Sequence, residues 1–121
     1  MQQILNLTQH LCTPDQVKAG VHEPVHKDKV QSLITFTSIP TEMGMRSRAE
    51  KLAYMTKEDG YQAAMIGGAP FFMAILEDEL KKQGIKPVYA FSQRESIDKE
   101  MPDGSVQKIN VFKHIGFYEV N

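Results

Sequence analysis

The sequence predicts an α/β fold: a small Rossmann-like, three-layer domain with a mostly parallel sheet and an antiparallel hairpin at its C-terminus. Apolar strand-like runs alternate with helical segments, which is typical of parallel strands joined by right-handed crossovers. An Asp-Gly pair at residues 103–104 lies between two further strand-like runs, as in a β-hairpin. The length of 121 residues suits one domain, so residues 1–121 are expected to form a single Rossmann-like domain.

The expected elements follow one another along the chain with short connections. In order, they are a strand over residues 4–8, a helix over 14–19, a loop over 21–27, helices over 28–36 and 41–58, a strand over 61–66, a helix over 70–83, a strand over 86–92, and a hairpin with strands over 95–101 and 106–112. Residues 116–120 are interpreted as a last short strand.

Capping residues and helix breakers set the boundaries in the first half of the chain. Thr13 can cap the first helix, because Pro14 fits the first turn and Gly20 can end the helix. Pro40 breaks the next helix, and Thr41 then caps a longer one. Apolar residues recur at helical spacing in both of these later segments.

Glycine and proline mark the boundaries in the second half. An apolar run ends at Gly67-Gly68, and a helix begins at Pro70 with apolar residues at helical spacing. Two lysines occupy the last turn of that helix, where they complement its dipole, and Gly84 caps it. The pattern therefore predicts a strand, a tight turn and an amphipathic helix.

The composition is that of an ordinary globular protein, with 41% hydrophobic and 24% charged residues. A net charge of −1, from 14 basic and 15 acidic residues, argues against a general grip on a long nucleic acid. The single cysteine, Cys12, cannot form an internal disulfide, so a reducing cytoplasm is the expected compartment. No apolar run approaches the ~18 residues of a membrane span, and residues 1–4 lack the features of a signal peptide.

A ligand site is expected at one edge of the sheet, because ligands of open parallel sheets bind beyond the carboxyl ends of the strands. This rule selects three segments that follow predicted strands. Their residues are Thr8, Gln9 and His10; Gly67, Gly68 and Ala69; and Ser92, Gln93, Arg94, Glu95 and Ser96.

The Gly67-Gly68 turn is the most informative of these segments. Two glycines let the backbone approach a ligand closely, and the helix that follows offers free N–H groups and the positive end of its dipole. A phosphate fits such a turn. The alternative is a tight strand-to-helix turn with no ligand, since the motif has neither the third glycine of a dinucleotide fingerprint nor the lysine of a P-loop.

Two residues are candidates for catalysis. His10 could act as a general base or as a hydrogen-bond partner of a ligand, or it could cap the next helix. Arg94 could make a bidentate contact to a phosphate, or it could pair with Glu95 or Glu100 or face water. Glu95 could instead orient a hydroxyl group or a base edge. Thr8 and Gln9 fit pocket lining and capping equally well.

The other histidines, the cysteine and two arginines are weaker candidates for a functional site. We expect no metal and no cofactor. His22 and His26 are four residues apart, but Pro24 makes a shared helical face doubtful. Cys12 lies near His10 without a third group, and is interpreted as a small buried residue. Arg46 and Arg48, on the long helix, are interpreted as part of a solvated face.

The opening of the chain resembles small CRISPR-associated Rossmann-like proteins. The residues concerned are Leu5-Asn6-Leu7-Thr8-Gln9-His10 and Thr13-Pro14-Asp15-Gln16, about the first fifth of the chain, and the general order of elements is also similar. The resemblance is to the CARF group, whose members bind cyclic oligoadenylate messengers, commonly as dimers, and include ring nucleases. It implies a homodimer, a nucleotide ligand and a role in antiviral defence on the host or the phage side.

Two functions remain open at this stage. The first is binding of a cyclic oligonucleotide or another nucleotide, with cleavage by a metal-independent ring nuclease as a further step. In that reaction His10 would be the base, and Arg94 and the glycine amides would stabilise charge. The second is a non-enzymatic interaction protein that docks through the C-terminal hairpin.

Overall fold

The computed structural model describes residues 3–121, which form a five-stranded sheet with four helices. In chain order the elements are β1 (Ile4–Asn6), α1 (Pro14–Lys18), β2 (Val21–His22), α2 (Lys27–Ile34), α3 (Glu42–Glu58), β3 (Ala63–Met65), α4 (Pro70–Lys82), β4 (Lys86–Glu100) and β5 (Val106–Glu119). Residues 1–2, part of the segment considered for a signal peptide, lie outside the described residues. No described helix is both long and apolar enough to cross a membrane.

The sheet has the order β2-β1-β3-β4-β5 and is parallel except for β4 and β5, which pair antiparallel. This confirms the predicted α/β class with its mostly parallel sheet and C-terminal hairpin. From β1 the chain moves to β2 at one edge, and then crosses back to β3 and β4 on the other side of β1. The direction of winding therefore reverses between β1 and β3.

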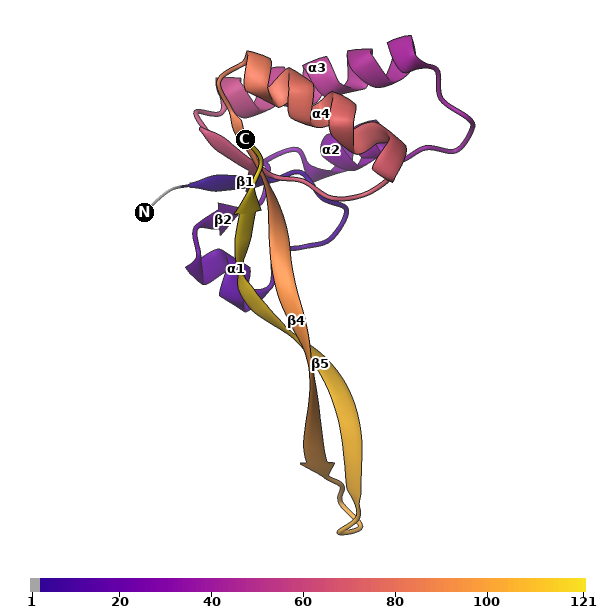
Figure 1. The fold of residues 1–121 in the computed structure, drawn as a ribbon, viewed down its shortest axis with the longest axis vertical. Coiled ribbons are helices and arrows are strands. Elements are labelled where there is room, and N and C mark those ends of the chain that lie inside the picture. Colours follow the sequence, from indigo (N-terminus) through magenta and orange to yellow (C-terminus); the bar gives the residue numbers. More distant parts are fainter. Residues whose placement is uncertain (1–2) are drawn as a thin grey trace.

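Helices cover the two faces of the sheet unequally (Figure 1). One face packs against α2, α3 and α4, with the largest buried side chains at Leu5, Leu7, Leu52, Phe72, Leu76 and Leu80. The other face is a smaller cluster, to which Cys12 and Phe117 add cover. Helix α1 lies on that side and buries none of its residues. Most of the core free energy therefore comes from the α2–α4 face.

The helix boundaries agree with the capping signals. Thr13 caps α1 through a reciprocal pair of hydrogen bonds with Gln16, and the Thr41 hydroxyl accepts from the amide of Gly44 at the start of α3. The predicted loop over residues 21–27 is wrong in part, because Val21 is buried and pairs with Ile4 to form β2. A strand of two residues has too little alternation to be seen in the sequence.

The segment after residue 91 also differs from the prediction. Residues 92–96 were expected to form a loop, but they lie inside β4, which continues without a break to Glu100. The predicted short strand at 116–120 belongs to β5, which pairs along the whole of β4 from Val88 onward. The sequence does not indicate a strand at residues 92–96, because these residues are polar. The strand is exposed on both faces, so no buried face requires apolar residues at alternate positions.

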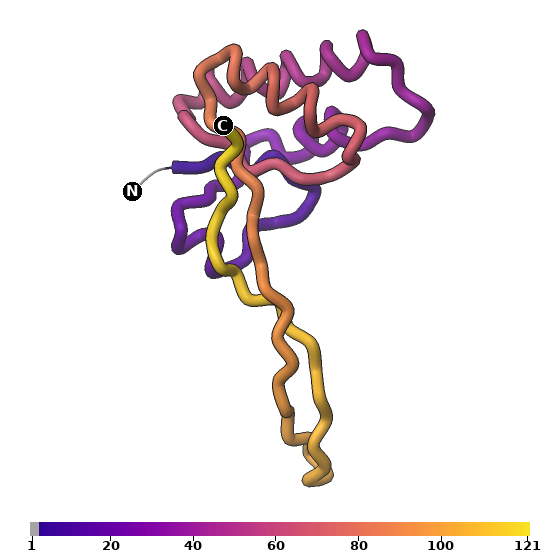
Figure 2. The backbone as a smooth tube through the Cα atoms, in the orientation of Figure 1, coloured from indigo at the N-terminus to yellow at the C-terminus, as the bar shows by residue number. Residues whose placement is uncertain are grey.

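Beyond the part of the sheet that the helices cover, residues 92–100 of β4 and 106–115 of β5 form a two-stranded arm (Figures 1 and 2). At its end, the amide and hydroxyl of Ser105 donate to the Asp103 carboxylate at 2.9 and 2.6 Å, and Gly104 has a φ of 86°. The predicted turn at Asp103-Gly104 is confirmed. None of the described helices covers either face of the arm, so backbone pairing and cross-strand side chains stabilise it.

Arg46 and Arg48 do not form the solvated face that the sequence suggested. The Arg46 guanidinium lies 2.7 Å from both the Asp78 and the Glu79 carboxylates and so ties α3 to α4. Arg48 donates to the carbonyls of Ser32, Leu33 and Thr35 at the end of α2, at 2.8–3.3 Å. Its guanidinium also lies 4.5 Å from the ring centroid of Phe36.

Replacing Arg48 by alanine is expected to lower the free energy of unfolding by about 1–2 kcal/mol, because the last carbonyls of α2 lose a charged donor. Urea denaturation followed by circular dichroism measures this loss. Lys51→Ala, an exposed position on the same helix, is the matched control and should change stability by less than about 0.5 kcal/mol. Equal losses in the two variants would show that the Arg48 contacts contribute nothing.

Candidate functional site

A cavity of about 460 Å³ opens at the carboxyl ends of β1 and β3, where the winding of the sheet reverses. Its walls come from the segment after β1, the segment after β3, the start of α1 and one stretch of β4. The lining residues are Thr8, Gln9, His10, Leu11, Thr13, Gln16, Met65, Ile66, Gly67, Gly68, Tyr89 and Ala90. The reversal point is where doubly wound sheets leave a crevice for ligands.

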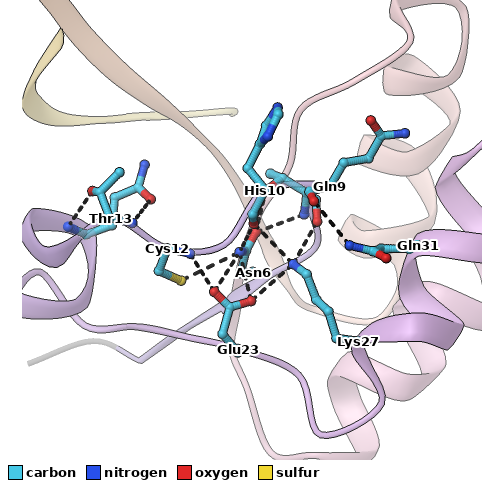
Figure 3. A network of polar contacts seen from close by, with 10 residues as sticks. Asn6, Gln9, His10, Cys12, Thr13, Glu23, Lys27 and Gln31 are labelled. Atoms are coloured by element: carbon cyan, nitrogen blue, oxygen red, sulfur yellow. Dashed lines mark hydrogen bonds and ion pairs between the residues drawn. The ribbon is translucent and has the colours of Figure 1, made fainter. Parts of the chain in front are cut away.

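Asn6, fully buried at the end of β1, holds the first wall of the cavity in place (Figure 3). Its Nδ2 donates to the carbonyl of His10 at 2.7 Å and to the Glu23 carboxylate at 3.1 Å. Its Oδ1 accepts from the amide and the hydroxyl of Thr8, at 2.9 and 2.6 Å. One side chain thus folds the segment from Thr8 to His10 back on itself.

Glu23, just after β2, and Lys27, the first residue of α2, complete this network (Figure 3). Lys27 Nζ lies 3.0 Å from Glu23 Oε1 and donates to the carbonyls of Thr8 and His10 at 2.8 and 3.2 Å. The carbonyls of Thr8 and His10 therefore accept hydrogen bonds from Lys27, which does not line the cavity. Figure 3 shows the His10 imidazole extending away from these contacts, so its ring is left unengaged by the network.

The carboxylate of Glu23 is held in its charged form. Partial burial alone would raise its pKa, but hydrogen bonds from Cys12, Lys27 and Asn6 outweigh burial and lower the pKa from 4.5 to about 2. The backbone amide of Cys12 donates to Glu23 Oε2 at 2.6 Å. An ionised Glu23 is thus part of the scaffold of the loop.

The same network favours the protonated thiol form of Cys12. Burial, followed by the hydrogen bond and the charge of Glu23, raises the pKa of the Cys12 thiol from 9.0 to about 12. Because the thiolate is the nucleophilic form, a Cys12–His10 catalytic pair has no support at neutral pH. Cys12, interpreted from the sequence as a small buried residue, is only partly buried and packs against the smaller core cluster.

The second wall of the cavity is the turn between β3 and α4. Gly68 has a φ of 147°, in the region that favours glycine. Ala69, at the N-cap of α4, makes no side-chain cap, so the first amides of the helix are not occupied by a capping side chain. A Cβ on Gly67 would lie 3.7 Å from Thr8, so the two walls are in close contact at this point.

The sequence predicted part of this lining and misplaced the rest. Thr8, Gln9, His10, Gly67 and Gly68 come together as expected, whereas Ala69 does not line the cavity. Residues 92–96, which include Ser92, Gln93, Arg94, Glu95 and Ser96, lie in the arm and not in the cavity wall, which β4 contributes to only through Tyr89 and Ala90. Strand continuity carries Arg94 away from the edge of the sheet, four residues past Ala90, roughly 13 Å along the strand.

The sequence analysis did not predict several of the residues that line the cavity. Thr13 and Gln16 were recognised only as helix-start residues, and the apolar lining residues Leu11, Met65, Ile66 and Tyr89 only as strand or loop positions. The hydroxyl of Tyr89 donates to Glu77, and burial together with this bond raises the pKa of Tyr89. The phenol therefore stays protonated, with its hydroxyl held by α4.

The histidine pair contributes no metal centre. His22 lies in β2 and His26 at the N-cap of α2, so the two do not share a helical face. Within residues 3–121, no group of three or more His, Cys, Asp and Glu side chains is placed to hold a metal ion.

A Glu23→Gln substitution is expected to lower stability at pH 7 by about 1–2 kcal/mol, since it removes a charged acceptor from the network. The folded pKa of about 2 lies below the ordinary value of 4.5, so the carboxylate stabilises the fold above about pH 4.5. That contribution is lost as the pH falls from 4.5 towards 2. Urea titrations at pH 7 and pH 3 should show the gap between variant and wild type narrowing; a constant gap would contradict the charge argument.

The comparisons with known proteins identify the family. A family model described as "Uncharacterized protein MJ1673 family" matches residues 2–118. No curated protein and no solved structure gives a significant match. Because the matched region covers almost the whole sequence, this chain belongs to the MJ1673 family.

Proposed function

We propose that this protein binds a phosphate-bearing nucleotide in the cavity at the carboxyl ends of β1 and β3. The observation that carries the proposal is the position of the cavity, at the reversal of the sheet, between a glycine turn and the N-terminus of a helix. Gly67 and Gly68 leave backbone amides accessible on this wall, and the uncapped start of α4 adds the positive end of a helix dipole.

The remaining lining suits the other parts of a nucleotide. Leu11, Met65, Ile66 and Tyr89 provide apolar surface for a base, and Gln9 and Gln16 provide amides that can donate and accept hydrogen bonds. A volume of about 460 Å³ is in the range of small-molecule sites. The resemblance of residues 5–16 to CARF proteins favours a cyclic oligonucleotide messenger of antiviral defence as the ligand, in a cytoplasmic protein.

Cleavage of that ligand would rest on His10 alone. The imidazole could take the proton from a ribose 2′-hydroxyl as its oxygen attacks the adjacent phosphorus. The bond from phosphorus to the 5′-oxygen would break as the 2′,3′-cyclic phosphate forms, and the 5′-oxygen would take a proton from water. Among the described residues no lysine or arginine lines the cavity, and Arg94 lies outside it, so charge stabilisation falls to the backbone amides. Backbone amides without a cationic side chain support binding of the nucleotide more strongly than its rapid cleavage.

A panel of phosphate, mononucleotides, and linear and cyclic oligoadenylates tests the proposal by thermal shift. A ligand at a hundredfold excess over its dissociation constant stabilises the fold by about 2.7 kcal/mol. We expect a shift with at least one nucleotide, while His10→Ala keeps the shift and slows release of cleaved product. No shift with any member of the panel would contradict nucleotide binding.

A second candidate function is supported by the arm. Its exposed apolar side chains include Ile97, Val106, Phe112 and Ile115, at 42–75% exposure, which is typical of a surface that meets a partner. In this alternative the protein is a non-enzymatic host or phage interaction factor. Shortening the arm between residues 94 and 112 should then abolish capture of the partner and leave the body folded.

A further inference from the structure

The arm leaves one edge of β4 without a strand partner. Strand β3 pairs with β4 only at residues 86–88, so the edge that faces away from β5 is open from Tyr89 to Glu100 within the described chain. An open edge of this length is a template for pairing with another strand. A two-stranded hairpin is also marginally stable by itself and gains stability from further strands.

From the charge pattern of this edge we propose that two copies of the chain dimerise by antiparallel pairing of their β4 strands about a two-fold axis at Ile97. In that register Arg94 lies opposite the partner's Glu100, and Glu95 lies opposite the partner's Lys99. Each pair occurs twice by symmetry. Opposite charges directly across a ladder stabilise it, and like charges destabilise it.

The neighbouring symmetric registers fit less well. In an antiparallel pair, residues directly opposite each other have their side chains on the same face. A symmetric dimer must therefore have one residue of β4 facing its own copy across the two-fold axis, and each other register places a different residue there. An axis at Ser96 keeps one kind of opposite-charge pair, Arg94 with the partner's Asp98. An axis at Asp98 sets two like carboxylates against each other. The Ile97 register is therefore the one with the greatest charge complementarity.

The same register completes an apolar row across the arms. Within one chain Ile97 is already paired with Ile109 across the hairpin, and Ile97 is 42% exposed. Pairing through Ile97 sets four isoleucines side by side, in the order Ile109, Ile97, the partner's Ile97 and the partner's Ile109. On the other face, Asp98 lies opposite Lys108 of its own chain. The Asp98 carboxylate therefore has an opposite charge across the hairpin without a basic residue of the partner.

The pairing also brings the turn of each arm to the partner's cavity. β4 ends at Glu100 and the chain then turns back, with the Met101 amide donating to the Ser105 carbonyl. The register therefore sets Met101 opposite the partner's Gln93, and the turn reaches towards the partner's Ala90, which lines the partner's cavity. The site of one copy would then be bordered by the Asp103-Gly104 turn of the other. This last step rests on the proposed function, whereas the dimer itself does not.

Charge reversal tests the register. Light scattering during size exclusion should show a dimer for the wild type, and the Glu95→Lys and Lys99→Glu variants should each raise the dimer dissociation constant at least about tenfold. The double variant, Glu95→Lys with Lys99→Glu, restores opposite charges and should dimerise like the wild type. Lys113→Glu, which reverses a charge on β5, is the matched control and should leave the dimer intact.

A symmetric cross-link provides a second readout. In a Cys12→Ser background, Ile97→Cys should form an intermolecular disulfide on mild oxidation, because facing residues lie about 5 Å apart. Ile109→Cys should not, since the two copies of residue 109 would be three strand spacings, about 14 Å, apart. A monomeric wild type, a double variant that stays dissociated, or equal cross-linking at the two positions would overturn the proposal.

Nucleotide affinity then separates the dimer from the shared site. If the turn borders the partner's cavity, Glu95→Lys should weaken binding of the nucleotide that gives the largest shift in the panel. Unchanged affinity in a dissociated variant would overturn the shared site and leave the dimer standing. A panel without any shift would contradict the proposed function and would not affect the oligomeric result.

Discussion

An Asn6→Leu variant is expected to lower the free energy of unfolding by about 3 kcal/mol. The side chain is fully buried and bonds to Thr8, His10 and Glu23. Leucine has a similar volume but no polar atoms, so the Thr8 amide loses its acceptor, the His10 carbonyl loses a donor and the Glu23 carboxylate loses one of its donors, all in a partly buried environment. Urea denaturation at pH 7 measures the loss.

An Asn6→Asp variant separates polar satisfaction from charge. It keeps the shape and the acceptor for Thr8 but sets a second carboxylate about 3.1 Å from Glu23. Two carboxylates this close cannot both ionise freely, so the variant should be destabilised at pH 7 and should recover as the pH falls towards 4. Asn110→Leu, an exposed position in β5, is the control and should change stability little. A similar loss in the control would contradict the role given to Asn6.

The second large effect is expected at Gly67, on the opposite wall of the cavity. Gly67→Asp should reduce affinity for an anionic nucleotide at least about a hundredfold, because it adds bulk and a negative charge beside the proposed phosphate position. A Cβ at this position would be in ordinary contact with Thr8, at 3.7 Å, so the fold should tolerate the change. Gly68 is less suitable for this test, because its φ of 147° would strain any other residue.

Gly67→Asn is the matched control for this substitution. It has the same size without the charge, so it should cost about tenfold in affinity and leave the larger part of the binding free energy. Isothermal titration calorimetry with the nucleotide that gives the largest thermal shift measures both constants. Equal affinities in the aspartate and asparagine variants would mean that no anionic group lies at this wall.

The elements that the sequence predicted best are those with strong local signals. The helix caps at Thr13 and Thr41, the glycine turn at 67–68 and the Asp-Gly hairpin turn all lie where they were predicted. Each depends on residues within four positions of one another, so tertiary context has little to override. The same locality explains why both walls of the cavity that follow β1 and β3 were found.

The misplaced residues share a different cause. Nothing local distinguishes a strand exposed on both faces from a polar loop, so residues 92–96 were assigned to the cavity and not to the arm. The network around Asn6 depends on Glu23 and Lys27, 17 and more residues away along the chain, and neither carries a motif. Arg48 likewise acts on carbonyls of another helix. Long-range pairing of this kind becomes visible only in the folded chain.

Binding at the reversal of the sheet is tested most directly by nuclear magnetic resonance of the ¹⁵N-labelled protein during titration with a cyclic oligoadenylate. The amide shifts should change most at residues 8–11, 67–68 and 71, on the two walls of the cavity and at the start of α4. The amides of the arm beyond residue 94 should change less. Saturating ligand without shifts at either wall, or with shifts centred on the arm, would contradict a nucleotide site between β1 and β3.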